Sequence, residues 1–459
     1  MALHTVAGEG EEIRYVDVTS LYPWVNKNAR YPIGHPTIIT QPRIQDIASY
    51  FGIVSVDILA PAELFHPVLP VRSGNKLTFP LCAACVKQEQ DNPMLERSDV
   101  CNHTPEERTL RGTWCTPEIE KALEKGYRVI KIHEVWHFSQ QRDGLFRDYV
   151  NTWLKLKQEA AGWPRWCDTE EKKQQYLTQY REREGIDLDY ASIQKNPGRK
   201  ATAKLMLNSF WGKFGERQNK PRTETITSPS QLFTLLFHSH KNVSTLRICN
   251  EDVLEAVSTD LDDNVVPSNK TNIFVAAFTT AWARLRLYEA LDVLQQQVLY
   301  YDTDSVIYRW KPGRPSIPIG DFLGEMTDEL DGDVITEFIS GGAKNYGYKT
   351  RGGKTECKVR GFTLNVRGKE VLNFETMKRN ILSEIDDPLE ERRVIRVNNP
   401  NHFQRNTTNK TIKLVHQVKQ YGLVFDKRVI DPDTKISYPF GYRAWSEVDD
   451  DNVDMLLDL

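Results

Sequence analysis

The chain has 459 residues, of which 39% are hydrophobic and 27% are charged, and its formal net charge is −3. These values are those of an ordinary globular protein with room for several subdomains, and they argue neither for nor against a nucleic-acid partner. A membrane span is not expected because no stretch approaches the roughly 18–20 apolar residues that a span needs. The N-terminus lacks the apolar core of a signal peptide, so we expect an intracellular protein.

The first predicted element is a strand that ends on an acidic residue. Residues 13–17 alternate in polarity, which places Ile13, Tyr15 and Asp17 on one face. Asp17 also opens the segment Asp-Val-Thr-Ser-Leu-Tyr-Pro, which runs to residue 23.

A set of metal-ligand residue types follows in the stretch 61–160. Cys82 and Cys85 form a Cys-x₂-Cys pair, and Cys101 and His103 form a Cys-x-His pair after a longer loop. Together they supply four ligands for tetrahedral Zn²⁺ and leave no position open for a catalytic water, so we expect a structural site. Cys115 is a rival fourth ligand, and four unrelated residues are the alternative. The remaining cysteines are expected to be isolated packing residues, namely Cys167, Cys249 and Cys357.

A basic helix is predicted around residue 204, with polar side chains recurring every four residues on one stripe. The stripe comprises Lys200, Lys204, Asn208, Trp211 and Gly212. The opposite face is expected to be an apolar back made by Leu205, Met206 and Phe210. A solvated basic helix is the alternative, but it would not require the Asn-Ser-aromatic-aromatic-Gly sequence that ends this segment.

An apolar helix over residues 275–287 is predicted to precede a hairpin. Residues 298–309 read as two short apolar strands joined by a polar turn. The turn carries Asp302 and Asp304, whose charges at a hairpin tip need not be buried among apolar neighbours. Taken alone, Asp-Thr-Asp is typical of an ordinary acidic turn.

Charge is clustered in the C-terminal third of the chain. Residues 344–369 hold eight Lys or Arg against a single acid, Glu356, which would give salt-dependent phosphate contacts. A solvated charged surface is the alternative. Residues 446–459 carry six acids in 14 residues and are expected to be disordered.

Three of these segments, in this order, resemble motifs A, B and C of family B DNA polymerases. Residues 17–23 resemble DxxSLYP, residues 204–212 resemble KxxxNSxYG, and residues 300–305 resemble YxDTDS. Further segments resemble the protein-primed branch, which includes bacteriophage enzymes and Polinton (Maverick) transposons. They are the KxY-like Lys344-Asn345-Tyr346, the run Lys358-Val359-Arg360-Gly361, and residues 143–149 and 421–429. The resemblance extends from residue 11 to about residue 443.

The resemblance implies an α+β right-hand fold of palm, fingers and thumb, with an antiparallel palm sheet and inserted subdomains. It places the palm in residues 1–60 and 268–364, the fingers in 161–215 and the thumb in 365–445. The stretch 61–160 matches the insertion that engages a terminal protein, and 216–267 matches a second insertion. The tail 446–459 stands outside these units.

The resemblance also implies roles for single residues. Catalytic carboxylates would be Asp17, Asp302 and Asp304, because two-metal transfer needs acids that hold two Mg²⁺ roughly 3.5–4 Å apart. The metal ligands would be Asp17, Asp304 and the Val18 carbonyl, with Mn²⁺ as a possible substitute. The nucleotide would contact Ser20, Leu21, Tyr22, Lys200, Lys204, Asn208 and Trp211. The primer strand would contact Lys344, Tyr346 and Lys358. Tyr22 would exclude ribonucleotides, and Trp211 stands where the family has tyrosine.

The expected function is therefore DNA-directed DNA polymerisation, with primer-template DNA and deoxynucleotides as partners and a terminal protein as a further candidate. Only 16 residues precede Asp17, so we expect no 3′–5′ exonuclease in this chain. If the chain comes from a eukaryotic element, the expected compartment is the nucleus. One alternative function is that of an inactive DNA-binding remnant of a mobile-element polymerase. Another is a reverse transcriptase or RNA polymerase, although those enzymes usually carry adjacent aspartates where Thr303 here separates two.

Overall fold

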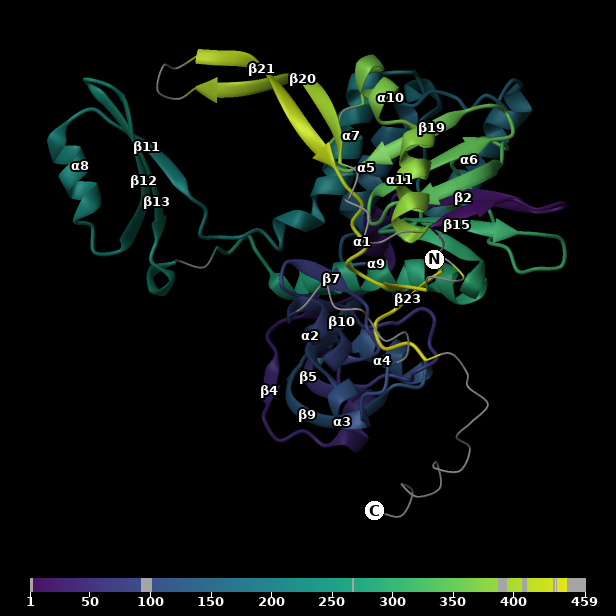
Figure 1. The fold of residues 1–459 in the computed structure, drawn as a ribbon, viewed down its shortest axis with the longest axis horizontal. Coiled ribbons are helices and arrows are strands. Elements are labelled where there is room, and N and C mark those ends of the chain that lie inside the picture. Colours follow the sequence, from purple (N-terminus) through teal and green to yellow (C-terminus); the bar gives the residue numbers. More distant parts are fainter. Residues whose placement is uncertain are drawn as a thin grey trace.

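The computed structural model describes residues 3–91, 101–265, 268–362, 364–386, 394–406, 411–431, 434 and 436–443. Its largest element is an eight-stranded sheet with the central order β14-β15-β2-β17-β18-β19 (Figure 1). The N-terminal strands of this sheet are β1 (His4–Val6) and β2 (Glu12–Val18). The others are β14 (Val298–Asp302), β15 (Ser305–Trp310), β16 (Met326–Asp328), β17 (Ile335–Ser340), β18 (Asn345–Thr350) and β19 (Thr355–Val359). All its strand pairs are antiparallel, and its strands come from two distant parts of the chain.

Strand β2 lies in the middle of this sheet because both of its faces are apolar. Ile13 and Tyr15 pack with Phe338 and other residues on one face. Val16 and Val18 pack on the other face, against the helix α9 (Ile273–Leu294). Asp17 is therefore carried at the end of a strand that the core holds on both sides.

Helix α9 lies between the large sheet and a second, smaller sheet (Figure 1). It is capped at its N-terminus by Asn272, whose side-chain oxygen accepts hydrogen bonds from the N–H groups of Phe274 and Val275. Phe278 and neighbouring residues belong to the core under the large sheet, whereas Leu285 and Tyr288 belong to the core of the second sheet. Burial on both sides explains why this helix is apolar all round instead of having a single apolar stripe.

The second sheet is four-stranded, with the order β4-β9-β5-β8. Its strands are β4 (Thr37–Ile39), β5 (Gly52–Leu59), β8 (Leu110–Cys115) and β9 (Arg128–His137). Two of these strands precede residue 60 and two follow it, so the sheet takes strands from both sides of the expected boundary. Beside it lie two two-stranded sheets and three helices. The first small sheet pairs distant strands, β3 (Arg30–Ile33) and β10 (Gln140–Asp143), and the second is the hairpin of β6 (Val71–Ser73) and β7 (Lys76–Thr78). The helices are α2 (Ala83–Asp91), α3 (Pro105–Arg108) and α4 (Thr116–Glu124).

Four helices pack together at the segment 17–23, and the first of them contains its last three residues. They are α1 (Leu21–Asn28), α5 (Arg147–Glu159), α6 (Glu170–Glu184) and α7 (Pro197–Ser209). Tyr149 of α5 stacks on Phe210, with ring centroids 4.1 Å apart, and its hydroxyl donates to the Met206 carbonyl. We expected Leu205 to lie on the apolar, buried face of α7, and this prediction was wrong, because its side chain is 64% exposed. The buried positions of the helix are Ala203 and Leu207. These two lie four residues apart, so they share one helical face.

Residues 222–260 form a lobe that stands apart from the rest of the molecule in Figure 1. It contains the sheet β11-β13-β12 and one helix, with the bounds β11 (Arg222–Ile226), α8 (Pro229–Leu236), β12 (Lys241–Asn250) and β13 (Val253–Asp260). Its small core includes Ile226, Leu235 and Ala256.

The C-terminal part begins with two helices and a hairpin, which are α10 (Val366–Val371), α11 (Phe374–Asp386), β20 (Ile395–Asn406) and β21 (Thr411–Tyr421). The chain then returns to the second sheet through the short strands β22 (Val429–Ile430) and β23 (Ser437–Tyr438). There the Leu81 N–H donates to the Phe440 carbonyl at 2.7 Å. The acidic stretch 446–459, expected to be disordered, lies outside the described residues.

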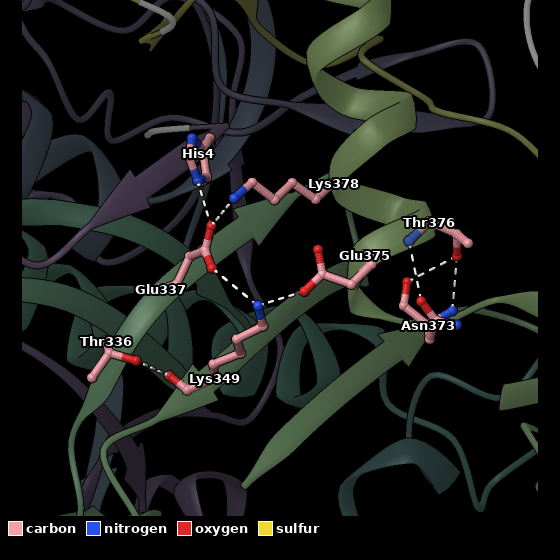
Figure 2. Close-up of polar contacts among 8 residues, drawn as sticks. All are labelled: His4, Thr336, Glu337, Lys349, Asn373, Glu375, Thr376 and Lys378. Atoms are coloured by element: carbon pink, nitrogen blue, oxygen red, sulfur yellow. Dashed lines mark hydrogen bonds and ion pairs between the residues drawn. The ribbon is translucent and has the colours of Figure 1, made fainter. Parts of the chain in front are cut away.

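A partly buried carboxylate ties helix α11 to the large sheet (Figure 2). Glu337 of β17 accepts from Lys378 of α11 and from His4 of β1, and it pairs with Lys349 of β18. Burial raises the pKa of Glu337, but the bonds from Lys378, His4 and Lys349 outweigh it and bring the pKa to about 2. The group is therefore held ionised, and it links three strands and a helix.

Among the described residues, no helix combines the length and apolarity needed to cross a bilayer.

Candidate active site

The segments resembling motifs A and C meet at one end of the large sheet. Strands β2 and β15 are in register with Asp17 opposite Ser305, and the Val18 N–H donates to the Asp304 carbonyl at 2.7 Å. Strands β14 and β15 form the predicted hairpin, with Asp302 opposite Ser305. The structure thus brings Asp17, Asp302 and Asp304 together across nearly 300 residues of sequence.

The turn that presents the two aspartates has an unusual backbone. Thr303 has a φ of 47°, in the left-handed region that β-branched residues rarely adopt. Its hydroxyl donates to the Asp302 carboxylate at 3.1 Å, and the Ser305 hydroxyl donates to the Asp302 carbonyl at 3.3 Å. Such local strain persists only where the surroundings determine it, and it is concentrated at functional sites.

The carboxylates form an electrostatically unfavourable group. Burial first, and then Asp304 and Glu329, raise the pKa of Asp17 to about 7, although Lys358 and Lys204 act against the shift. Burial and the neighbouring Asp302 likewise raise the pKa of Asp304. Half-buried carboxylates that repel one another have the oxygen donors and the charge that suit Mg²⁺. The residues present therefore fit the expected divalent cations.

Lys344 lies directly beside the aspartates. Its ammonium group is 3.4 Å from an Asp302 carboxylate oxygen, and its backbone N–H donates to the Tyr300 hydroxyl at 2.9 Å. The side chain is exposed to solvent.

Tyr346 and Lys358 lie on the neighbouring strands β18 and β19. Tyr346 is 6% exposed, and its hydroxyl is 3.0 Å from the Tyr15 hydroxyl. The exposed Lys358 lies over the rings of Tyr15 and Tyr346 and donates to the Tyr15 hydroxyl at 3.3 Å. Tyr346 is therefore a support for Lys358 in this structure, and Lys358 is the group that faces solvent.

Tyr22 and Trp211 are stacked, with ring centroids 4.4 Å apart and an interplanar angle of 20°. Tyr22 follows the turn of motif A, and Trp211 lies in the 3₁₀ turn that follows α7. Burial, and then the negative charge of Asp304, raise the pKa of the Tyr22 hydroxyl. The ring therefore lies close to the carboxylates. Leu21 is 2% exposed and packs in the core, so only its backbone is open to a ligand.

A third lysine joins the two that were expected from the sequence. Lys157 of α5 donates to the Ser20 hydroxyl at 3.1 Å. Burial, followed by the charges of Lys204 and Lys200, lowers the pKa of Lys157, so the three ammonium groups are near one another. Lys200, Lys204 and Asn208 are exposed on α7. Sequence reasoning missed Lys157 because its partner Ser20 is 137 residues away and nothing local marks it.

A cavity of about 390 Å³ opens beside the carboxylates. Its lining includes Tyr22, Arg284, Asp302, Thr303, Ser437 and residues 424–428. Arg284 of α9 is held by Glu118, at 2.8 Å, and its charge also acts on Tyr22. The C-terminal segment therefore forms part of the wall next to motif C.

The predicted zinc ligands also come together. One ligand atom from each of Cys82, Cys85, Cys101 and His103 lies within 4.8 Å of the others. Cys115, the rival ligand, is instead buried in the core with Val25 and Phe278. Cys167 and Cys357 are free thiols elsewhere, and the Cys249 side chain lies outside the described residues.

Comparison with known proteins agrees with this geometry. Residues 3–164 match the family described as DNA polymerase type B, organellar and viral. A probable DNA polymerase of Neurospora intermedia is 21% identical over 370 residues, which are 77% of this chain and 31% of that protein. The chain thus spans about a third of the length of this curated relative.

Solved structures of Phi29 DNA polymerase share the fold. The orthorhombic crystal form has a TM-score of 0.53 and 15% identity, over 92% of this chain and 61% of that one. The post-translocation binary complex with primer-template DNA has a TM-score of 0.51 and 15% identity, over 92% and 60%. The right-hand fold with an antiparallel sheet, expected from the motifs, is confirmed. With the match over residues 3–164 and the curated relative, these findings make the chain similar to type B DNA polymerases in sequence and in fold.

Proposed function

We propose that this chain catalyses template-directed addition of deoxynucleotides to the 3′ end of a primer. The observation that carries the proposal is the meeting of Asp17, Asp302 and Asp304 at one end of the sheet. A group of lysines, Lys157, Lys200 and Lys204, lies close to them. An acidic centre that can hold cations and a basic group that can hold a triphosphate are the two parts that nucleotidyl transfer requires.

Each part has a distinct role in the proposed reaction. Two Mg²⁺ ions held by Asp17, Asp304 and the Val18 carbonyl would activate the primer hydroxyl and stabilise charge on the leaving pyrophosphate. The lysines bind the triphosphate and orient it for in-line attack. Lys344, paired with Asp302, places the primer end beside the acids. Lys358, supported by Tyr346 and Tyr15, holds a primer phosphate.

Tyr22 and Trp211 form the side of the site where the new nucleotide would lie. We propose that Tyr22 packs under the sugar, where a 2′-hydroxyl would collide with its ring. Trp211 supports that ring by stacking and offers an aromatic face to the base. Ser20, held by Lys157, and Asn208 complete the contacts with the nucleotide.

The subdomain limits expected from the sequence are part of this proposal, with motifs A and C in the palm and α7 in the fingers. The chain matches 92% of its length to a polymerase solved with primer-template DNA, which supports such DNA as the partner. A terminal protein as primer, docked on residues 61–160, and the absence of exonuclease activity from residues 1–459 both stay predictions. The second is tested by incubating the protein with Mg²⁺ and a 3′-mismatched primer without nucleotides.

Primer extension with Mg²⁺ on a short template tests the function. We expect the wild-type chain and Asp321→Asn, which changes an exposed aspartate, to extend the primer. Asp304→Asn should abolish extension while primer-template affinity, measured by fluorescence anisotropy, changes less than about threefold. Binding by the wild-type chain without extension would instead indicate an inactive DNA-binding remnant. Extension that persists in Asp304→Asn would overturn the assignment of the carboxylates.

A further inference from the structure

We propose that Cys82, Cys85, Cys101 and His103 form a structural zinc centre that fastens the C-terminal segment 436–443 onto the first insertion. The four residues lie outside the polymerase motifs and contact none of the catalytic carboxylates. Cys85 is in the first turn of α2, and Cys101 and His103 directly precede α3. The site thus joins two short helices that have little apolar core of their own.

The distances within the cluster match tetrahedral coordination. His103 Nδ1 is 3.5 Å from Cys82 Sγ, 3.4 Å from Cys85 Sγ and 3.5 Å from Cys101 Sγ. With Zn–S of about 2.3 Å and Zn–N of about 2.0–2.1 Å, a nitrogen and a sulfur on one tetrahedral zinc lie about 3.5–3.6 Å apart. Hydrogen bonding does not explain three equal distances, because Nδ1 offers one hydrogen or one lone pair. All three cysteines are free thiols, so a disulfide does not explain them either.

The surroundings of the cluster suit bound thiolates. The Cys85 backbone N–H donates to Cys82 Sγ at 3.4 Å, and Arg108 donates to Cys101 Sγ at 3.1 Å. Three thiolates and one divalent cation leave a single negative charge, which the buried Arg108 guanidinium offsets. The Gln88 amide lies 3.1 Å from His103 Nε2, where it orients the ring.

The same residues hold the C-terminal segment. Arg108 also donates to the Gly441 carbonyl at 3.0 Å, so one side chain joins a ligand sulfur to the segment. Arg443 donates to the backbone carbonyls of Cys101 and His103, the second at 2.8 Å. Gly441 has a φ of +86°, and a Cβ there would overlap Cys82. The segment therefore packs directly on the ligand backbone, and its position depends on that of the ligands.

Fastening this segment affects the cavity beside the active site. Ser437 and residues 424–428 line that cavity together with Tyr22 and Asp302. When the ligand loops are free of metal, the contacts through Arg108 and Arg443 lose their fixed partners. We expect the segment to detach and this wall to open, although no catalytic group is removed.

Metal content tests the centre without any need for polymerase activity. Protein made without a histidine tag, stripped with a chelator and reloaded with Zn²⁺, should retain about one zinc per chain after dialysis. Cys357→Ser, which changes a free thiol elsewhere, should retain the same amount, whereas Cys85→Ser should retain less than a tenth. Loading with Co²⁺ should give thiolate-to-cobalt absorption in the wild type and in Cys357→Ser, but not in Cys85→Ser. Wild-type protein that holds no zinc, or lacks that absorption, would overturn the proposal.

Hydrogen exchange on the wild-type chain tests whether the zinc centre holds residues 436–443 in place. Removing zinc should speed exchange at least tenfold in residues 436–443 and at the Leu81 amide, and leave β14 and β15 unchanged. Arg443→Ala should keep its zinc and show the same faster exchange, because it removes the link and not the ligands. Equal protection of 436–443 with and without zinc would show that the metal does not hold the segment.

Discussion

Tyr22 stacks on Trp211, so the aromatic residue of motif A is supported from behind by the aromatic residue of motif B. The ring centroids are 4.4 Å apart and the planes are 20° from parallel, so the Trp211 ring covers one face of Tyr22. A ring held on one face has less freedom to move away from a 2′-hydroxyl. If Tyr22 selects the sugar as proposed, this contact should help to hold its ring in place.

Removing the Tyr22 ring should relax this selection. We expect Tyr22→Val to raise ribonucleotide incorporation relative to deoxynucleotide at least tenfold, because no side chain then occupies the space below C2′. Tyr22→Phe is the matched control and should leave the ratio unchanged, since it keeps the ring and the stack. The ratio of kcat/KM values for the two nucleotides measures the effect, and an unchanged ratio in Tyr22→Val would rule out a steric gate.

Lys157 should contribute to nucleotide affinity. It is half-buried near Lys200 and Lys204, where its charge is unfavourable unless an anion is bound. Lys157→Ala should raise KM for the nucleotide about tenfold while primer-template affinity stays constant. Lys155→Ala, two residues away on α5 and paired with Glu159, should change KM less than twofold. A Lys157→Ala enzyme with normal KM would remove this residue from the site.

The raised pKa of Asp17 predicts a pH-dependent stability of the metal-free protein. An acid whose pKa is raised by folding costs nothing below its ordinary value of 3.8, and its full cost is reached above about 7. Asp17→Asn should therefore stabilise the protein in EDTA at pH 8 by about 1–2 kcal/mol, after allowance for solvent screening, and hardly at all at pH 4. Urea unfolding at both pH values measures this. Equal effects of the substitution at pH 4 and pH 8 would contradict it.

Glu337 predicts the opposite dependence. Its pKa is lowered on folding to about 2, so its stabilisation is fully present above its ordinary value of 4.5 and is lost as the pH falls towards 2. Glu337→Gln should cost on the order of 2–3 kcal/mol at pH 7 and little near pH 2. Glu375→Gln changes a side chain that is 61% exposed and shares Lys349, so it should cost less than about 1 kcal/mol. If Glu337→Gln and the wild type had the same denaturant midpoint at pH 7, the contacts of Glu337 would not stabilise the fold.

Local sequence patterns predicted the parts of the site whose geometry is set locally. The alternating polarity of residues 13–17 predicted the strand that carries Asp17. The polar turn between two apolar runs predicted the hairpin that carries Asp302 and Asp304. The Cys-x₂-Cys and Cys-x-His spacings also selected the residues that cluster, and set Cys115 apart.

Features that depend on tertiary packing were not predictable in the same way. The burial of Tyr346 and Leu21 follows from the packing of distant strands and helices, which no local pattern reveals. Lys157 approaches Ser20 only because α5 packs beside α1. Strand β5 pairs with β8 and β9, which lie on the other side of the expected boundary at residue 60, because strand pairing does not depend on closeness in sequence.

Helix α9 has a consequence for how this protein unfolds. One side of the helix completes the core of the large sheet, and the other completes the core of the four-stranded sheet. If the helix leaves the core of one sheet, the apolar side chains in the core of the other sheet also become exposed. The two sheets should therefore melt in one cooperative transition, and the four-stranded sheet should not move or unfold independently of the large one.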